Sequence, residues 1–581
     1  MKMKYVNILF TILLVYLFYL MVSLYIPYQL HQLEHTSLFV GGTDVFLQSI
    51  LQLGGFGKWI ALFGTQFFAF WGIASWAFIL PVLILFAVTA YLLPIKRSYA
   101  LPVASWGAVS LLLSMFDYNN GWVGAVSLSL SFCVLLIISF LRMLITRTIV
   151  FLVSLPCIAW LFGPVVWVYL ICGICLLTNE KNYKLLLFSS VGIVALMFVV
   201  IHSLGMIGTF QQVMSPIFYY DIMNEFPLHH WIPWSILALV FIGSRIVHFD
   251  FVRHKVLRWT MYSCAWLLPC VLLVSYAPKL TNKQMQVLYR LNHYSYTENW
   301  DSILRVLSGT RLDNWLYMNY LNMALAQKGL LGDNAFLFKP QGRAALMVNL
   351  SPDGIVRMLK SDINYAVGCI AEAQHQAFDA QIAFHKGMGI QTLKRLVQTN
   401  LIFGHYAVAE KYLDIIEKTT FNKEWTQKYR TFLYDDEKIS ADAELGEKRR
   451  SLVRDNRLVL VNGWTPELEN IVRINPLNRK AMDYLGIAYL LGKEMDAFRL
   501  LIEQHYGTDA LPQLPVAFQQ AALVLYRDNE SMLNKYGILQ EVKNEYNRFL
   551  EWEEKNKNNP NRKRIMESEF GHTYWYYAKF I

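Results

Sequence analysis

The first 277 residues alternate between long apolar runs and short polar loops. A helix needs about 20 apolar residues to cross a bilayer, and the pattern predicts a polytopic bundle of about nine transmembrane helices. Only Gly163-Pro164 separates the fifth run from the sixth, so residues 147–179 form either one span or two. The first run is long and no small-residue cleavage pattern follows it, which favours a retained span over a signal peptide. The runs are 6–27, 66–93, 100–116, 121–141, 147–163, 164–179, 185–203, 232–248 and 259–277.

Lysine and arginine occur in every second loop of this region. The intervening loops, 28–57, 117–120 and 204–231, contain neither residue type. Because basic residues in short loops stay on the cytoplasmic side, the pattern predicts a cytoplasmic N-terminus and an extracytoplasmic residue 278. The basic residues that carry this prediction are Lys2, Lys4, Lys96, Arg97, Arg142, Arg147, Lys181, Lys184, Arg253, Lys255 and Arg258.

A short amphipathic segment, residues 43–53, lies in the first extracytoplasmic loop. Thr43 is expected to cap a helix whose first turn carries Asp44, and Gly54-Gly55 to end it. Such a helix is too short to span and is expected to lie at the membrane surface, beside the start of the second span. The predicted apolar face is Phe46, Leu47, Ile50, Leu51 and Leu53, and the predicted polar face is Asp44, Gln48, Ser49 and Gln52.

Residues 278–581 have the apolar spacing of consecutive amphipathic helices. The clearest unit is the hairpin at 475–498, with a turn at Gly492-Lys493, and a weaker copy turns at Gly404. Such hairpins predict a tetratricopeptide-like solenoid, because each must stack on a neighbour to bury its apolar face. The alternative is an irregular helical domain without true repeats. The whole chain is thus predicted to be all-α, with a transmembrane domain at 1–277 and an extracytoplasmic helical-repeat domain at 278–581.

Charge is distributed unevenly between these two domains. The chain has 581 residues, of which 16% are charged, but only thirteen of its 52 Lys and Arg and seven of its 42 Asp and Glu lie in 1–277. The formal net charge of +10 is shared by both domains, and no dense basic stripe interleaved with aromatics is present. Nucleic-acid binding is therefore not expected. Cys369 alone lies beyond residue 277, so the second domain has no internal disulfide.

Two short motifs match metal or redox patterns. His31, Glu34 and His35 have the H-x-x-E-H spacing of a zinc protease family, yet no further element of that family follows, and a water-facing helix end is the better interpretation. Cys172 and Cys175 have C-x-x-C spacing inside an apolar run, where thiolates are costly, so small residues for helix packing are favoured. No metal or cofactor is predicted.

Acidic residues on the predicted outer face allow one enzymatic interpretation. Membrane glycosyltransferases that use lipid-linked sugars carry an acidic residue in the first outer loop, where it binds a metal or acts as a base. Asp44 and Glu34 occupy the corresponding place and are the candidate catalytic residues. The competing interpretation makes Asp44 only a helix-start residue. The other polar groups of this face are Asp117, Asp221, Glu225, His202, His229 and His230.

The C-terminal segment joins a charged run to an aromatic cluster. Residues 551–564 predict a mobile connection, and the sequence HTYWYYAKFI after it predicts a segment that packs on its own domain or at the membrane interface. Packing on its own domain is the favoured interpretation.

The segments LEHTSLFVGGTDVFLQ, GGFGKWIALFGTQFF, NWDSIL and FGHTYWYY give the chain a resemblance to a family of multi-pass membrane proteins from Bacteroidota, a domain of unknown function. The resemblance implies an inner-membrane protein of a Gram-negative bacterium with its second domain in the periplasm, and it implies no catalytic residue. We therefore expect a membrane-anchored scaffold that binds a periplasmic protein or peptide. The alternative is a glycosyltransferase-like enzyme acting on a lipid-linked sugar, so the sequence does not decide whether the protein is an enzyme. Membrane lipid is the other expected partner.

Overall fold

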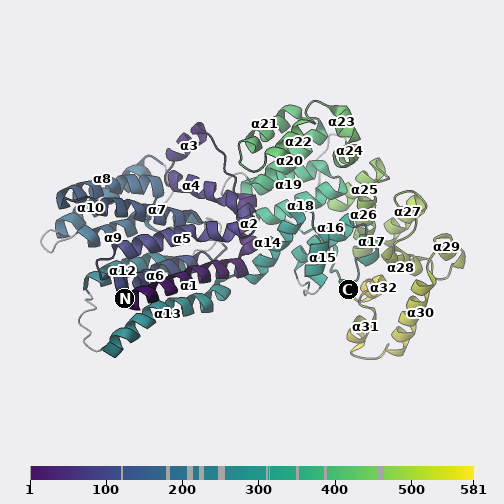
Figure 1. The fold of residues 1–581 in the computed structure, drawn as a ribbon. Coiled ribbons are helices and arrows are strands. Elements are labelled where there is room, and N and C mark those ends of the chain that lie inside the picture. Colours follow the sequence, from purple (N-terminus) through teal and green to yellow (C-terminus); the bar gives the residue numbers. More distant parts are fainter. Residues whose placement is uncertain are drawn as a thin grey trace. The chain divides into compact units, whose positions relative to one another are not determined.

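The protein is helical throughout the part of the chain that its computed structural model describes (Figure 1). The structure describes residues 2–581 except 119–121, 178–182, 206–212, 221–227, 247–254, 309–311, 313, 349–352, 385–388 and 454–462. The structure has no named strand among these residues, and an isolated bridge joins Thr508 to Leu511. The all-α prediction is therefore confirmed for the described chain. Lys181 and Arg253, which contributed to the predicted orientation, lie outside it.

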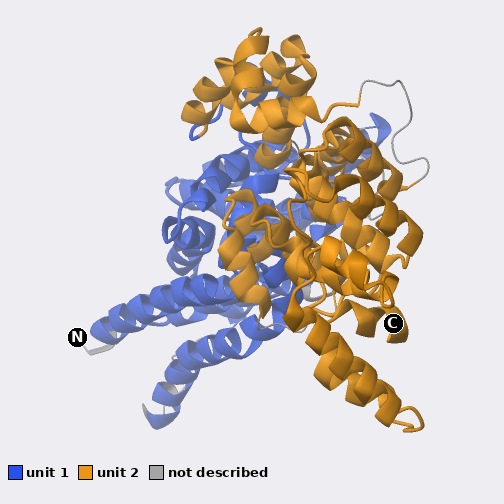
Figure 2. Ribbon diagram, turned by 90° about the vertical axis from the view of Figure 1, so that its right-hand side faces the viewer, with its two compact units in different colours: residues 1–289, 418–421 blue, residues 290–417, 422–581 orange. Residues whose placement is uncertain are grey.

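The chain forms two compact units, which Figure 2 shows in separate colours. Unit 1 comprises residues 1–289 and 418–421, and unit 2 comprises 290–417 and 422–581. The helices of unit 1 are α1 (Lys2–Tyr25), α2 (Pro27–Thr36), α3 (Thr43–Ile50), α4 (Gly55–Thr65), η1 (Gln66–Ala69), α5 (Ile73–Leu92), α6 (Arg97–Ser114), α7 (Trp122–Ser139), α8 (Leu144–Phe162), α9 (Val166–Leu177), α10 (Tyr183–Ser203), η2 (Pro216–Tyr219), η3 (Leu228–Trp231), α12 (Ile232–Ile246) and α13 (Lys255–Leu280). Helix α14 (Lys283–Tyr296) contains the boundary between the units.

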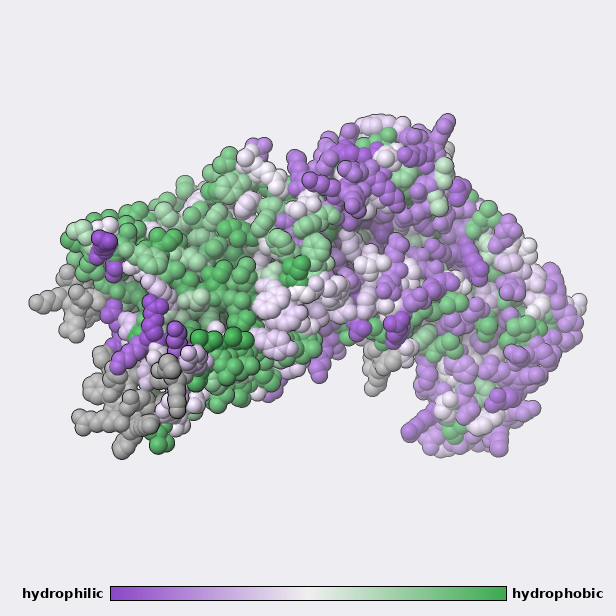
Figure 3. All heavy atoms as spheres, viewed as in Figure 1, coloured by the Kyte–Doolittle hydropathy of each residue, from purple (hydrophilic) through white to green (hydrophobic). Residues whose placement is uncertain are grey.

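Among the described residues of unit 1, six helices are long and apolar enough to cross a membrane: α1, α5, α7, α8, α10 and α13. They coincide with six of the nine predicted spans, which makes the chain a multi-pass membrane protein. The other three predicted spans are the helices α6, α9 and α12, of 18, 12 and 15 residues. Figure 3 shows apolar residues over much of the visible face of unit 1, as expected for a surface in contact with lipid.

Helix α6 has the length of a span but a lower hydropathy than the six candidates, and it is surrounded by protein. It packs against α1, α5, α12 and α13, and its Ser105 and Ser110 side chains are buried and bond to carbonyls of α6 itself. A helix enclosed by neighbours does not need a fully apolar surface. The low hydropathy of α6 therefore follows from its central place in the bundle.

Helices α8 and α9 form an antiparallel hairpin. The Ser154 hydroxyl lies 2.5 Å from the Tyr169 hydroxyl, and one turn earlier on α8 the Phe151 ring covers Gly173 of α9. The chain reverses at Gly163, whose φ of 80° is in the left-handed region. The described part of this region, residues 147–177, thus forms two helices, of which α8 has the length of a span and α9 is shorter.

Side-chain hydrogen bonds join the parts of α1, α6 and α13 that are predicted to lie towards the cytoplasm. Asn7, near the start of α1, donates to the Ser98 carbonyl at the start of α6 and accepts from Trp266 of α13. At the other end of the bundle, Trp160 of α8 donates to the Ile50 carbonyl. The arrangement is the one that alternating spans require.

The segment between the first two spans forms three short α-helices, α2, α3 and α4, and the helix predicted at 43–53 corresponds to α3 alone. Helix α3 ends at Ile50, and Gly54, with φ of 69°, lies in the turn that precedes α4. The predicted end at Gly54-Gly55 was thus wrong, and so was the Thr43 cap, because Gly42 occupies the cap position and Thr43 is already helical. The predicted faces fit better: Asp44, Gln48 and Gln52 are exposed, Phe46, Ile50 and Leu53 are partly buried, and Leu47 and Leu51 are exposed.

Unit 2 is built of short helices in which sequence neighbours pack together. The 475–498 hairpin is α26 and α27 with the predicted turn, and the weaker copy is α20 and α21. The helices are α15 (Trp300–Ser308), α16 (Trp315–Gln327), α17 (Leu331–Asn334), η5 (Arg343–Ala345), α18 (Gly354–Val367), α19 (Ile370–Ala383), α20 (Ile390–Phe403), α21 (Tyr406–Glu417), α22 (Lys423–Arg430), α23 (Asp436–Ala441), α24 (Ala443–Arg450), α25 (Trp464–Ile474), α26 (Arg479–Leu491), α27 (Met495–His505), α28 (Val516–Leu525), α29 (Glu530–Lys535), α30 (Gln540–Lys555), α31 (Arg562–Phe570) and α32 (Tyr574–Phe580).

Helices far apart in sequence also pack together in unit 2. Helix α26 contacts α16 and α18, and α17 contacts α28. A linear stack of repeats has contacts between neighbouring repeats only, so this part of unit 2 is folded back on itself.

The charged run at 551–564 was predicted to be a mobile connection, and this was wrong for its ends. Helix α30 extends to Lys555 and α31 begins at Arg562. The aromatic segment after it packs within unit 2, as predicted: Tyr574 lies against Phe336, and Tyr577 donates to the Leu491 carbonyl.

Candidate functional site

Unit 2 contains a groove of about 710 Å³, a volume within the range of ligand sites. Three parts of the chain form its walls: residues 343–348, the middle of α18, and the start of α25 with Ala488 and Glu494 beyond it. The lining residues are Arg343, Ala344, Leu346, Met347, Val348, Lys360, Asn364, Gly463, Trp464, Thr465, Pro466, Glu469, Ala488 and Glu494.

The helix α18, which forms one wall, is capped at both ends. Asp353 caps its N-terminus by accepting from the Ile355 amide at 2.7 Å, and Gly368, with φ of 92°, ends it in the left-handed conformation. Residues Met358 to Val367 are all buried. Lys360 and Asn364 are one turn apart, so both side chains lie on the face that lines the groove.

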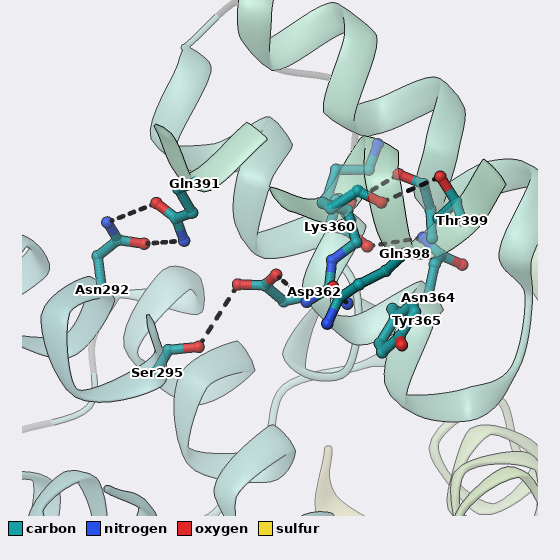
Figure 4. A network of polar contacts seen from close by, with 12 residues as sticks. Asn292, Ser295, Lys360, Asp362, Asn364, Tyr365, Gln391, Gln398 and Thr399 are labelled. Carbon is teal, nitrogen blue, oxygen red and sulfur yellow. Dashed lines mark hydrogen bonds and ion pairs between the residues drawn. The ribbon is translucent and has the colours of Figure 1, made fainter. Parts of the chain in front are cut away.

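Polar contacts behind the groove hold α18 against its neighbours (Figure 4). Asp362 accepts from Arg395 of α20 at 2.9 Å, and the Arg395 guanidinium stacks over the Tyr365 ring at 3.7 Å. Burial raises the pKa of Asp362, and the charge of Arg395 opposes this shift. Because removing one partner of a buried pair leaves the other without compensation, this pair fixes the position of α18.

The opposite wall, residues 343–348, is held by the buried side chains of Asn319 and Asn322, and Asn322 donates to the Ala345 carbonyl at 2.9 Å. The Asn319 amide group donates to the carbonyls of Ala344 and Ala345 at 2.8 and 2.9 Å, and its oxygen accepts from the Val348 amide at 2.8 Å. Asn319 is fully buried on α16. Because hydrogen bonds hold the backbone carbonyls and amide of this irregular segment, it offers a fixed surface to the groove.

Trp464 connects the third wall to α18. Its indole Nε1 donates to the Asn364 Oδ1 at 3.0 Å, and its ring packs edge-on against Tyr484 at 5.5 Å. The indole remains partly exposed in the groove. A fixed aromatic ring in a hollow is the kind of side chain that contributes most to binding energy.

Three of the four charged side chains that line the groove have a partner. Arg343 forms an ion pair with Glu494 at 2.5 Å and donates to the Ala488 carbonyl. Glu469 accepts from the Tyr489 hydroxyl at 2.6 Å. Lys360 is different, because no hydrogen bond or ion pair joins its ammonium to another described residue.

The two candidate catalytic residues from the sequence do not form a site with each other. Asp44 is exposed on α3. Glu34 is partly buried on α2, where its carboxylate lies 2.8 Å from the neighbouring His35 imidazole. No hydrogen bond or ion pair joins Asp44 to Glu34 within the described chain. Both residues therefore stay candidates that rest on sequence position alone.

The two motifs with metal or redox spacing are built into helix packing. His31 and His35 are buried on α2, and the His31 ring lies 4.1 Å from the Trp71 ring. This burial contradicts the interpretation of the motif as a water-facing helix end. Cys172 is buried and Cys175 partly buried on α9, with Gly173 between them in close contact with α8. Among the described residues, no three His, Cys, Asp or Glu side chains converge as metal ligands do.

One cluster in unit 1 joins outer-face residues that the sequence named separately. The His230 Nε2 lies 3.0 Å from the Asp117 carboxylate, and its Nδ1 is hydrogen-bonded to the Tyr220 hydroxyl. Burial, followed by the charge of Asp117, raises the pKa of Tyr220. The cluster ties the segment before α12 to the end of α6. The sequence carried no signal for Tyr220. Asp221 and Glu225 lie outside the described residues, as does the His229 side chain.

These observations define the class: a multi-pass membrane protein whose second unit is helical and contains a groove. The chain belongs to the family of unknown function DUF6057, whose model matches residues 1–581. This match confirms the expected membership of a family of unknown function. No curated protein and no solved structure matches the chain.

Proposed function

We propose that the protein is a membrane-anchored scaffold whose unit 2 binds an extended polypeptide segment in the groove. The observation that carries this proposal is the groove itself, whose three walls are each fixed by buried polar contacts. A pre-formed surface loses little conformational entropy on binding, so the interactions that it makes contribute to affinity.

The lining of the groove suits a polypeptide. Leu346, Met347 and Ala488 supply apolar surface, and the Trp464 indole supplies an aromatic anchor. Polar groups of Asn364 and Thr465 lie among them. An extended chain alternates side chains with backbone amides and carbonyls, so it presents both kinds of partner at close intervals.

We propose further that nine helices of unit 1 cross the membrane, which puts unit 2 outside the cytoplasm. The lack of lysine and arginine in 28–57, 117–120 and 204–231 supports this orientation. So does the enclosed position of α6, which explains its polarity without removing it from the bundle. In a Gram-negative host unit 2 would be periplasmic, and its helical hairpins would form a tetratricopeptide-like binding domain.

Site-specific photocrosslinking in living cells tests the binding proposal. A photoreactive amino acid replaces Met347 in the groove, and a matched control replaces Leu500, which is 52% exposed on α27 and does not line the groove. The expected result is a polypeptide adduct at Met347 that is absent at Leu500.

The crosslinked segment is then synthesised as a peptide and titrated against the full-length protein in lipid nanodiscs. Trp464→Ala is expected to weaken its binding by more than tenfold, because a buried aromatic anchor contributes about 2 kcal/mol or more. An adduct with lipid alone, or a synthetic peptide that binds Trp464→Ala as well as the wild type, would contradict the proposal.

A further inference from the structure

Helix α25 begins in the groove with its backbone amides uncapped. Its first residues, Trp464, Thr465 and Pro466, line the groove, and the cap position is Gly463, which has no side chain to accept a hydrogen bond. The first amides of a helix have no carbonyl partner within the helix, and they carry the positive end of its dipole. Within the described residues no side chain accepts from the Trp464 or Thr465 amide. This end of the groove therefore offers free donors.

Lys360 lies in the same groove and is the second feature that favours an anion there. The residue is only 6% exposed, yet its ammonium has no hydrogen-bond or ion-pair partner among the described residues. Burial lowers the pKa of Lys360, while the more distant carboxylates of Glu372 and Asp379 act in the opposite direction. Lys360 lines the groove, so an anion bound there would supply the partner that the ammonium lacks.

The acidic residues nearby do not supply that partner. Glu372 accepts from Gln376 at 2.7 Å, and Asp379 pairs with Arg357. Within the groove, Glu494 pairs with Arg343 and Glu469 accepts from Tyr489. The ammonium of Lys360 and the first amides of α25 are thus donors of the groove that bond to no acceptor among the described residues.

We propose that this end of the groove binds the C-terminal carboxylate of the partner polypeptide, with Lys360 and the α25 amides as its donors. The inference rests on the proposed function and names the feature of the partner that is recognised. A planar carboxylate can accept from an ammonium and from backbone amides at once, and hydrogen bonds to a charged group are the stronger ones.

The end of a chain fits better than an acidic side chain within it. Lys360 lies on the stretch of α18 in which every residue from Met358 to Val367 is buried, so this wall closes the groove. A polypeptide that reaches Lys360 cannot continue through α18. The apolar neighbours Leu346 and Ala488 favour an apolar side chain on the last residue of the ligand.

Peptide retention by the full-length protein in nanodiscs tests the inference. Three pools of random octapeptides without Asp or Glu are used: one with a free C-terminal carboxylate, one amidated, and one amidated with a single Glu introduced. The variants are Lys360→Met, Lys360→Arg and, as a control, Lys423→Met, an exposed lysine on α22 outside the groove. Mass spectrometry measures the retained fraction of each pool, and thermal unfolding checks that each variant is folded.

The free-carboxylate pool is expected to be retained about tenfold better than the amidated pool by the wild type and by Lys423→Met. Lys360→Met should reduce this preference to less than twofold, and Lys360→Arg should keep part of it. Equal retention of carboxylate and amide pools, or an unchanged preference in Lys360→Met, would overturn the inference. Equal retention of the Glu-containing amidated pool would overturn the assignment to a chain end.

The two proposals can fail separately. If photocrosslinking identifies a polypeptide in the groove but the pools show no preference for a carboxylate, the scaffold proposal stands and this inference is wrong. If Met347 gives no polypeptide adduct and no pool is retained above the level of an empty nanodisc, both are wrong.

Discussion

Asp483 of α26 illustrates how burial sets the chemistry of a single residue. Its Oδ1 atom is buried and accepts no hydrogen bond from any described residue. Burial raises the pKa of Asp483 to about 7, opposed by the charge of Arg479 and reinforced by that of Asp333. In the unfolded chain the same carboxyl titrates near 3.8. The folded protein therefore binds a proton that the unfolded chain has already lost between these two pH values.

This shift predicts that Asp483→Asn stabilises the protein in a pH-dependent way. As pH rises from about 4 to about 7, the wild type loses stability because its native state must hold a proton or bear a buried charge, and above about 7 the loss is complete. The neutral variant escapes this loss. At about 1.4 kcal/mol per pH unit, its advantage at pH 8 is up to about 4 kcal/mol, and it should be small at pH 4.

Thermal unfolding of both proteins in detergent at pH 4, 6 and 8 measures the effect. Asp496→Asn is the control, because that carboxylate is 95% exposed. An advantage of Asp483→Asn that does not grow with pH would show that the carboxyl is ionised in the folded protein at all three values.

Helix α3 is the element for which sequence and structure can be compared most closely. Its Phe46 ring lies 5.0 Å from Trp59 and 6.4 Å from Phe56, both on α4. Asp44 is exposed at its first turn. The helix is thus held to α4 by its aromatic face, while its acidic residue contributes no hydrogen bond to another described side chain.

This arrangement predicts different results for substitutions at Phe46 and at Asp44, which lie on the same short helix. Phe46→Asp should lower the amount of protein in membranes, because a charge replaces a ring that packs on two others. Asp44→Asn should leave both the membrane level and the photocrosslinking at Met347 unchanged. Quantitative immunoblotting of membranes measures the first effect. Loss of function in Asp44→Asn at normal abundance would favour the enzymatic interpretation instead.

The α8–α9 hairpin predicts which residue of the C-x-x-C segment matters. A side chain at Gly173 would overlap the Phe151 ring, so Gly173→Leu should force the helices apart and cost about 1–3 kcal/mol or more. The double substitution Cys172→Ala with Cys175→Ala should have a much smaller effect, because both side chains serve as small packing groups. Membrane abundance and thermal unfolding measure both. Greater damage from the cysteine substitutions than from Gly173→Leu would indicate a redox or metal role.

At the scale of the whole molecule, the helices that fall short of the length and hydropathy of a span decide the topology. Six crossings would leave unit 2 on the same side as the N-terminus, and nine would place it on the opposite side. Whether helices α6, α9 and α12 cross the membrane therefore decides between six and nine crossings. They pack within the same bundle as the six longer ones: α12 contacts both α6 and α9.

Nine crossings predict that protease added to intact spheroplasts digests unit 2 and leaves unit 1 in the membrane. Immunoblotting with a C-terminal tag should show loss of the full-length band within the period in which a cytoplasmic marker stays intact. Protection of the tag until the spheroplasts are lysed would mean an even number of crossings.

The pattern of apolar residues determined the helical class, the six longest spans and the hairpins at Gly404 and Gly492, because each depends on local periodicity and turn chemistry. The same pattern could not place the end of α3 or α30. Helix ends depend on tertiary contacts such as the Trp160 bond to Ile50 that holds the turn after α3. At the ends of α3 and α30, the capping and charge patterns of the local sequence therefore did not predict where the helix stops.

The groove was decided by the tertiary structure alone. Its walls come from residues near 345, 360 and 464, which are brought together by Asn319, by the pair of Asp362 with Arg395, and by the bond from Trp464 to Asn364. None of these side chains stands out in the sequence, because each is a common polar or aromatic residue on a helix. Their significance lies in burial and partners, and both arise only when segments 29 to 100 residues apart meet in the fold.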